Sequence, residues 1–223
     1  MKATLMSSIW LRAQQSAVSL WHDHKGIAAT EFAMIVPLML VTFFGTVEFS
    51  SGLDVDRKVT LASRTLSDLT SQSSAQSLTD AYMQNVFTST MAILQPYLAT
   101  PGNARISQVY VNSSGVATIQ WSEAATFPAG AQQATLTPST RNAGDIVTTQ
   151  VPAALLVKQT FLIWSEVSYL YKPAVGYVMV KGGLTLSDFA YSRPRQYTCL
   201  FYNTFIPPFT NPIANPSTNC PMS

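Results

Sequence analysis

An apolar run at residues 27–47, IAATEFAMIVPLMLVTFFGTV, constrains this chain more than any other feature of its sequence. Glu31 is the only charged residue in the run. At a rise of about 1.5 Å per residue, a helix of this length spans the roughly 30 Å hydrocarbon core of a bilayer. A cleaved secretory signal is the competing interpretation, but its apolar region is about 7–15 residues long and ends at a small-residue site, whereas Glu48 and Phe49 follow here. The sequence therefore predicts a transmembrane helix at residues 27–47.

The distribution of charge predicts the orientation of this helix. Only 11% of the residues are charged, and 13 Lys+Arg against 11 Asp+Glu give a net charge of +2. This excess is too small for a phosphate-tracking surface, which argues against a nucleic-acid partner. The leader at residues 1–26 carries Lys2, Arg12 and Lys25, whereas Glu48 is the first charged residue after the run. The positive-inside rule therefore predicts a cytoplasmic N-terminus, with the rest of the chain outside the inner membrane.

The chain is poor in residues that carry catalytic or metal chemistry. It has two histidines, His22 and His24, both in the leader, and two cysteines, Cys199 and Cys220. Neither an HExxH nor a CxxC motif occurs, and the carboxylates lie in no catalytic motif, so we predict no catalytic residue, no metal site, no cofactor and no enzymatic activity. In an oxidising extracytoplasmic compartment the two cysteines are expected to form a disulfide.

Glu31 lies one turn inside the apolar run, where an ionised group is costly unless it is paired. A cut after Gly26 would make Ile27 the new N-terminus, and its ammonium group would lie on the same helical face as Glu31. The two charges could then neutralise each other within a chain or between neighbours. In the alternative interpretation, Glu31 faces the lipid headgroups at the start of the helix and no processing occurs.

The arrangement G-x-x-x-x-E-F from Gly26 to Phe32 resembles the prepilin class of type IV pilus systems. The closest resemblance is to the TadE-like pseudopilins of Tad (Flp) pili, in which a leader peptidase cuts after the glycine. Three further features add to the likeness: Pro37 within the run, Glu48 after it, and the basic pair Arg57–Lys58. The segment SYLYKP at residues 168–173 is a weaker similarity, and Phe32 departs from the tyrosine that is frequent at that position.

This resemblance implies a structural protein of a bacterial pilus. It assigns leader-peptidase recognition and cleavage to Gly26, Ile27, Glu31 and Phe32. The implied function is that of a minor pilin or pseudopilin that takes part in Flp/Tad pilus assembly and so in adhesion. The implied partners are the prepilin leader peptidase, other pilins, the inner-membrane assembly platform and membrane lipid. The alternative is an uncleaved single-pass envelope protein with a ligand- or scaffold-binding ectodomain, which would retain residues 1–26.

After the membrane segment, the sequence predicts an α+β ectodomain of pilin-like architecture with an antiparallel sheet. An apolar stripe at helical spacing continues from Val55 to Leu69, and we expect it to pack on the chain's own domain. A second helix is predicted from a cap at Thr79–Asp80 until Pro96. Strands are predicted around the turn at residues 113–115, at residues 164–173 and at residues 184–192, with a long loop at residues 124–144.

The chain is thus divided into five segments. We expect a cytoplasmic basic leader at residues 1–26 and a transmembrane helix at residues 27–47. An amphipathic helical segment at residues 48–100 and a β-rich extracytoplasmic domain at residues 101–198 follow. Residues 199–223 form a Pro-rich tail, which is irregular and closed by the Cys199–Cys220 disulfide.

Overall fold

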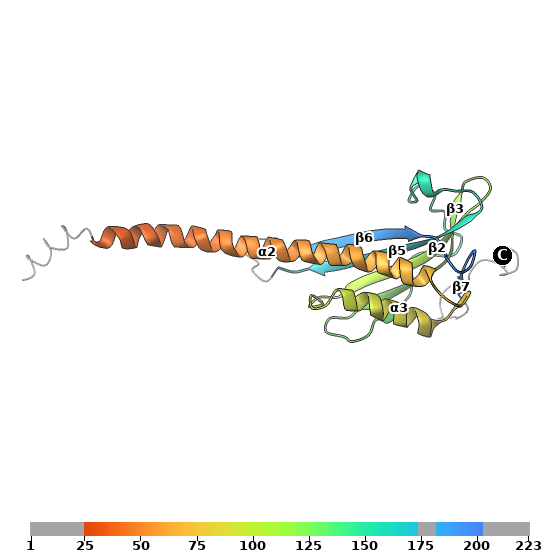
Figure 1. Ribbon diagram of the computed structural model, residues 1–223, viewed down its shortest axis with the longest axis horizontal. Helices are drawn as coiled ribbons and strands as arrows, with labels where there is room; N and C mark the ends of the chain where they lie inside the picture. Colours follow the sequence, from red (N-terminus) through yellow and green to blue (C-terminus); the bar gives the residue numbers. More distant parts are fainter. Residues whose placement is uncertain (1–24, 174–181, 203–223) are drawn as a thin grey trace, which may run out of the picture. The chain divides into compact units, whose positions relative to one another are not determined.

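The computed structural model describes residues 25–173 and 182–202 of the 223-residue chain (Figure 1). The chain divides into two compact units, residues 1–47 and residues 48–223. The predictions for most of the leader, and for Cys220 and the rest of the tail after Tyr202, lie outside the described residues.

Helix α2 (Lys25–Ser71) contains the predicted transmembrane segment and continues beyond it, with Pro37 inside the helix. Its threonines bond back to carbonyl oxygens of the preceding turn, as in Thr30 Oγ1 to Ile27 O and Thr46 Oγ1 to Thr42 O, both 2.8 Å. These hydroxyls are therefore satisfied within the helix, which suits an apolar surrounding. The prediction that one long helix extends past residue 47 is confirmed.

The second half of α2 packs on its own domain. Val55, Val59, Ala62 and Leu66 follow one another at spacings of four, three and four residues and are at most 1% exposed. They join one hydrophobic core with residues of the sheet. This confirms that the apolar stripe serves packing within the chain.

Helix α3 (Asp80–Ile93) begins where its capping residue predicts. Thr79 Oγ1 accepts a hydrogen bond from the backbone N–H of Tyr82 at 3.3 Å, which satisfies one of the open donors of the first turn. Met83, Val86 and Phe87 face the same core as α2. The predicted second helix is therefore confirmed.

The sheet has five antiparallel strands in the order β4-β3-β2-β5-β6 (Figure 1). The strands are β2 (Gly102–Val111), β3 (Ala117–Phe127), β4 (Thr135–Thr137), β5 (Thr160–Tyr171) and β6 (Leu184–Ser192). The β2–β3 turn is closed by Asn112 Oδ1, which accepts from the N–H groups of Ser114 and Val116, and Gly115 supplies the positive φ of 84°. The predicted hairpin, the strand at residues 184–192 and the α+β class are confirmed.

Two expectations about the irregular segments are wrong. The segment at residues 124–144 is not one loop, because β3 extends to Phe127 and β4 pairs with it. The chain after Cys199 begins with a strand, β7 (Phe201–Tyr202), which pairs in parallel with β1 (Ser77–Leu78). Strands β4, β1 and β7 have only two or three residues and are too short to show an alternating pattern. The sequence pattern also places the end of β3 too early in the chain.

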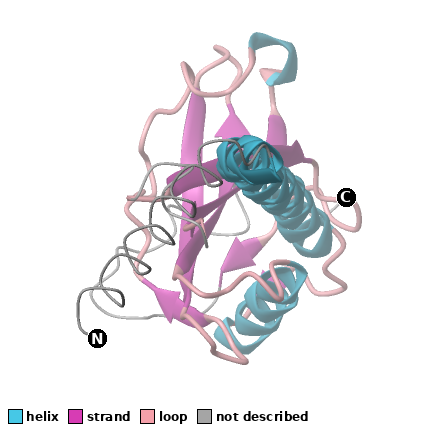
Figure 2. Ribbon diagram, turned by 90° about the vertical axis from the view of Figure 1, so that its left-hand side faces the viewer, coloured by secondary structure: helices cyan, strands magenta, loops and turns pink. Residues whose placement is uncertain are grey.

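The two faces of the sheet are covered differently. The second half of α2, residues 48–71, and helix α3 lie over one face, which is called the inner face here (Figure 2). The opposite, outer face is covered at one end by Val147, Val151, Leu155 and Leu156, from the segment that contains the 3-10 helix η1 (Ala153–Leu155). The remainder of the outer face carries no helix in the described part of the chain.

Candidate functional site

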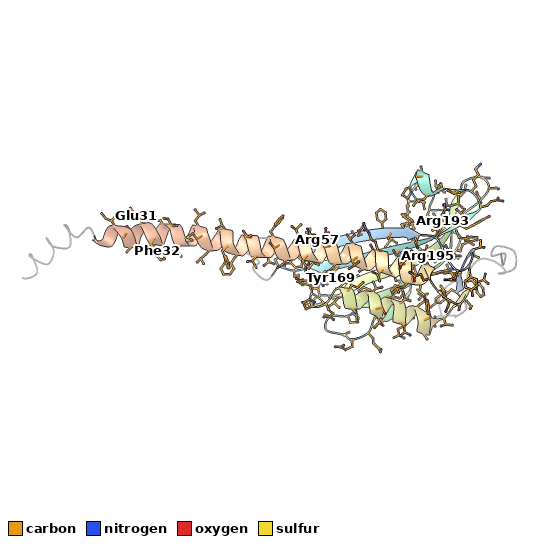
Figure 3. The ribbon with its side chains drawn as sticks, viewed as in Figure 1. Glu31, Phe32, Arg57, Tyr169, Arg193 and Arg195 are labelled. Atoms are coloured by element: carbon orange, nitrogen blue, oxygen red, sulfur yellow. The ribbon has the colours of Figure 1, made fainter. Side chains whose placement is uncertain are left out.

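The residues predicted for leader-peptidase recognition lie in the first two turns of α2, where Glu31 and Phe32 project from the helix (Figure 3). The side chains of Ile27 and Phe32 are 51% and 68% exposed, and Glu31 is also exposed. No atom would lie within 4 Å of a Cβ added at Gly26. Because the backbone is helical here, Ile27 and Glu31 lie one turn apart on one face, as their spacing predicts.

The surface around these residues is apolar along the whole run. The large exposed apolar side chains of α2 between residues 27 and 47 are Ile27, Phe32, Met34, Ile35, Leu38, Met39, Leu40, Val41, Phe43, Phe44 and Val47. A continuous apolar surface of this extent marks contact with lipid or with other proteins. In the described part of the chain, α2 is the one helix long and apolar enough to cross a membrane, so the protein has one possible membrane span.

Glu31 is the only charge on this apolar surface. The neighbouring Thr30 hydroxyl bonds to Ile27 O and does not contact the carboxylate. Within the described residues no hydrogen bond or ion pair to Glu31 is found. An ionised carboxylate in this setting needs a partner from outside the described segment.

Glu48 lies at the other end of the apolar run and has the opposite environment. Its side chain is 4% exposed, and the Tyr171 hydroxyl donates a hydrogen bond to Glu48 Oε1 at 2.7 Å. Burial and this bond to Glu48 raise the pKa of Tyr171 to about 12. The pair joins the second glutamate to the SYLYKP segment. No local pattern indicates this contact, because 123 residues separate the partners.

The basic pair Arg57–Lys58 has two environments. Lys58 Nζ donates to the carbonyls of Ile93 at 3.1 Å and Gln95 at 2.7 Å, at the C-terminal end of α3. It also lies 5.7 Å from the centre of the Tyr97 ring. Arg57 is exposed on α2 (Figure 3). Lys58 therefore stabilises the end of α3 and its contact with α2.

The tyrosines of the SYLYKP segment make structural contacts. The Tyr169 hydroxyl bonds to the carbonyl of Tyr97, and the Tyr171 hydroxyl bonds to Glu48. Both rings are at most 6% exposed and lie in the core below α2 and α3. The segment thus joins β5 to α2 and to the turn that follows α3, and its tyrosines serve packing within the domain.

The remaining predicted site residues are the cysteines. Cys199 is 1% exposed and packs with Phe161 and Tyr110. Cys220 lies outside the described residues, so the disulfide between them stays a prediction. Among the described residues, no three His, Cys, Asp or Glu side chains gather into a group that could hold a metal ion.

The described chain thus combines an α+β domain with one apolar helix that exposes its first half, buries a stripe of its second half and is a possible single membrane span. Residues 26–66 match the family model described as TadE-like protein. The match begins at Gly26 and includes Glu31, Glu48 and the Arg57–Lys58 pair. It confirms the resemblance to the TadE-like family that the sequence indicates. No curated protein and no solved structure matches the chain.

Proposed function

We propose that the chain is a TadE-like minor pilin or pseudopilin that a prepilin leader peptidase cuts after Gly26. It then takes part in Flp/Tad pilus assembly and so in adhesion, as a structural protein and not as an enzyme. The observation that carries this proposal is the family match, which begins at Gly26, the residue before the expected cut. The exposed apolar surface that follows supports it, since it needs lipid or other subunits to cover it.

Processing would change the electrostatics of the membrane segment. Before the cut, the basic leader residues Lys2, Arg12 and Lys25 hold the N-terminus on the cytoplasmic side of the inner membrane. The cut removes these cations and creates an ammonium group on Ile27, one turn from Glu31. The apolar helix then keeps a carboxylate with an available counter-charge and no longer carries a polar cytoplasmic tail.

The counter-charge gives Glu31 a role in assembly. The Ile27 ammonium of the same chain or of a neighbouring subunit neutralises the carboxylate, which lowers the cost of keeping it in apolar surroundings. A neighbouring subunit would also cover the apolar side chains of residues 27–47. The leader peptidase, other pilins, the inner-membrane assembly platform and membrane lipid are therefore the partners that we propose for this segment.

Complementation of a strain that lacks the gene tests this proposal. Wild-type protein should restore surface pili, whereas Gly26→Ala should not, because the peptidase requires the glycine. Gly45→Ala is the matched control, since it makes the same change in the same apolar helix outside the motif. Glu31→Gln keeps the size of the side chain and removes its charge, and it should reduce the number of pili although the protein is still cut.

Two outcomes contradict the proposal. Normal pili in the strain without the gene would exclude a role in assembly. Full complementation by Gly26→Ala, with residues 1–26 retained, would favour the alternative, an uncleaved single-pass envelope protein whose domain binds a ligand or a scaffold.

A further inference from the structure

The part of the outer face that no described helix covers contains a groove of about 500 Å³ across strands β3, β2, β5 and β6. This volume lies within the range of about 300–1,000 Å³ that is typical of small-ligand sites. One wall comes from Thr137, Pro138 and Thr140, at the end of β4 and in the loop that follows it. The other wall is Phe189, which is 56% exposed although it lies on a strand.

The strand register arranges the floor of the groove in two rows. The first row contains Ala124, Arg105, Glu166 and Phe189, which are paired across the four strands. The second row contains Asn103, Ser168 and Ser187, paired in the same way. Three short polar side chains therefore lie beside a charged pair and an exposed aromatic ring.

The charged pair is held in place by its neighbours. Arg105 Nε donates to Glu166 Oε2 at 2.9 Å, and Arg141 Nη2 donates to Glu166 Oε1 at 2.9 Å. The Arg141 guanidinium lies 3.4 Å from the centre of the Trp164 ring, and Arg105 also bonds to Thr140. Glu166 offsets the charge of Arg105, and these contacts fix both groups before any ligand arrives.

Phe189 is the exposed end of an aromatic row. Trp164 stacks on Tyr191 with ring centres 5.5 Å apart, and Tyr191 meets Phe189 edge to face at 5.7 Å. Tyr191 also donates a hydrogen bond to Gln150 O at 3.1 Å, so the row is tied to the segment that covers the other end of the face. The row holds the Phe189 ring in position at the edge of the groove.

We propose that this groove binds a neutral oligosaccharide. A sugar ring presents hydroxyl donors and acceptors at its rim and an apolar C–H face, which is attracted to the negative face of an aromatic ring. Phe189 supplies the aromatic surface, and Asn103, Ser168 and Ser187 supply amide and hydroxyl groups. Within the described residues these three polar side chains make no hydrogen bond. The carboxylates of Glu166 and Asp188 balance the guanidinium groups of Arg105 and Arg141, so the groove offers no excess positive charge for an acidic ligand.

Titration of the full-length protein with three saccharides tests the proposal. The probes are cellotriose, maltotriose and triacetylchitotriose, and the protein is kept in a polyoxyethylene detergent, because a maltoside headgroup would itself compete. Isothermal titration should detect binding of at least one probe. Phe189→Ala should weaken that binding by about tenfold or more, which corresponds to about 1.4 kcal/mol.

Leu184→Ala is the matched control, because Leu184 lies on the same strand, is 50% exposed and does not line the groove. It should bind the probe as the wild type does. Asn103→Ala is a second groove variant at an exposed position, and it should also weaken binding. The proposal is overturned if none of the three saccharides binds, or if Phe189→Ala and Asn103→Ala both bind as the wild type. These outcomes leave the processing of Gly26 unaffected, since that step does not depend on the groove.

Discussion

The two halves of α2 are one continuous helix with opposite surfaces. Residues 27–47 expose nearly every large apolar side chain, whereas residues 48–71 bury a stripe at helical spacing against the sheet. The first half is mainly apolar, with Glu31 as its only charge, whereas polar and charged residues make up most of the second half. The apolar residues of the second half recur at helical spacing, so they form one stripe against the sheet.

The two glutamates that bound the apolar run differ in the same way. Glu31 is exposed in the first half, and the described residues supply it with no partner. Glu48 is buried in the second half and accepts a hydrogen bond from Tyr171. The difference suggests that Glu48 serves the stability of the domain and that Glu31 serves contacts with other molecules.

The largest expected effect on stability is the difference between a leucine substitution in the buried half of α2 and one in its exposed half. Leu66→Ala removes a side chain with no exposed surface and should destabilise the domain by about 2–5 kcal/mol, through lost burial and a cavity. Leu40→Ala makes the same change at a position that is 49% exposed in the first half, and it should shift the free energy of unfolding by less than about 0.5 kcal/mol. Denaturant unfolding followed by tryptophan fluorescence measures both. An equal loss of stability in Leu66→Ala and Leu40→Ala would contradict the difference in packing between the two halves of α2.

The partly buried carboxyl of Glu123, to which no hydrogen-bond donor is found in the described part of the chain, should make stability depend on pH. Burial, with a smaller contribution from Asp80, raises the pKa of Glu123 to about 7 from an ordinary value of 4.5. The folded state therefore binds the proton more tightly, so stability is highest below about pH 4.5 and falls as the pH rises towards 7. Because Glu123 is partly exposed, we expect a loss of about 1–3 kcal/mol.

Glu123→Gln isolates this pH effect, since the amide cannot ionise. Its free energy of unfolding should change less than that of the wild type between pH 4.5 and pH 8. The nearby Asp80 carboxylate accepts a hydrogen bond from the Tyr202 hydroxyl, and both groups remain in the variant. An unchanged pH dependence in Glu123→Gln would assign the effect to another group.

The contact between Glu48 and the SYLYKP segment should contribute a similar or smaller amount. Tyr171→Phe removes the hydroxyl that bonds to the buried Glu48 and should cost about 1–3 kcal/mol. Tyr197→Phe is the matched control, because the Tyr197 hydroxyl bonds to Ser74 O at an exposed position. Thermal unfolding of the two variants decides the point, and a loss no greater than that of Tyr197→Phe would contradict a structural role for the Glu48 contact.

The smallest expected effect on stability is a difference between the two residues of the basic pair, Arg57 and Lys58. Lys58→Met keeps most of the side-chain length but removes the donor to Ile93 O and Gln95 O, so we expect a loss of about 0.5–1.5 kcal/mol. Arg57→Met at the adjacent exposed position should change stability by less than about 0.5 kcal/mol. Denaturant titrations of both variants under one condition provide the comparison. A larger loss of stability in Arg57→Met than in Lys58→Met would contradict the stabilising role given to Lys58.

Local sequence patterns predict most of the fold. The apolar run and the stripe from Val55 to Leu69 predict α2, and Thr79 predicts the start of α3. Strand β6 (Leu184–Ser192) has the predicted bounds. The pairing of Ser77–Leu78 with Phe201–Tyr202 could not be predicted, because two-residue strands far apart in the sequence carry no periodic signal.

The functional sites also differ in how well the sequence predicts them. Gly26, Ile27, Glu31 and Phe32 can be identified from sequence because their motif is local. The Glu48–Tyr171 contact and the rows of the outer-face groove depend on strand register, which joins residues from distant parts of the chain. Arg105 and Glu166 become a pair only once β2 and β5 are aligned.

The N-terminus of the protein in its native membrane tests the central claim most directly. Intact mass and N-terminal sequencing should show that wild-type protein and the Gly45→Ala control begin at Ile27, whereas Gly26→Ala retains residues 1–26. That result would assign the exposed half of α2 to processing and assembly. If the wild type also begins at Met1, the chain is not processed at Gly26 and the account of Glu31 and its new ammonium partner is contradicted.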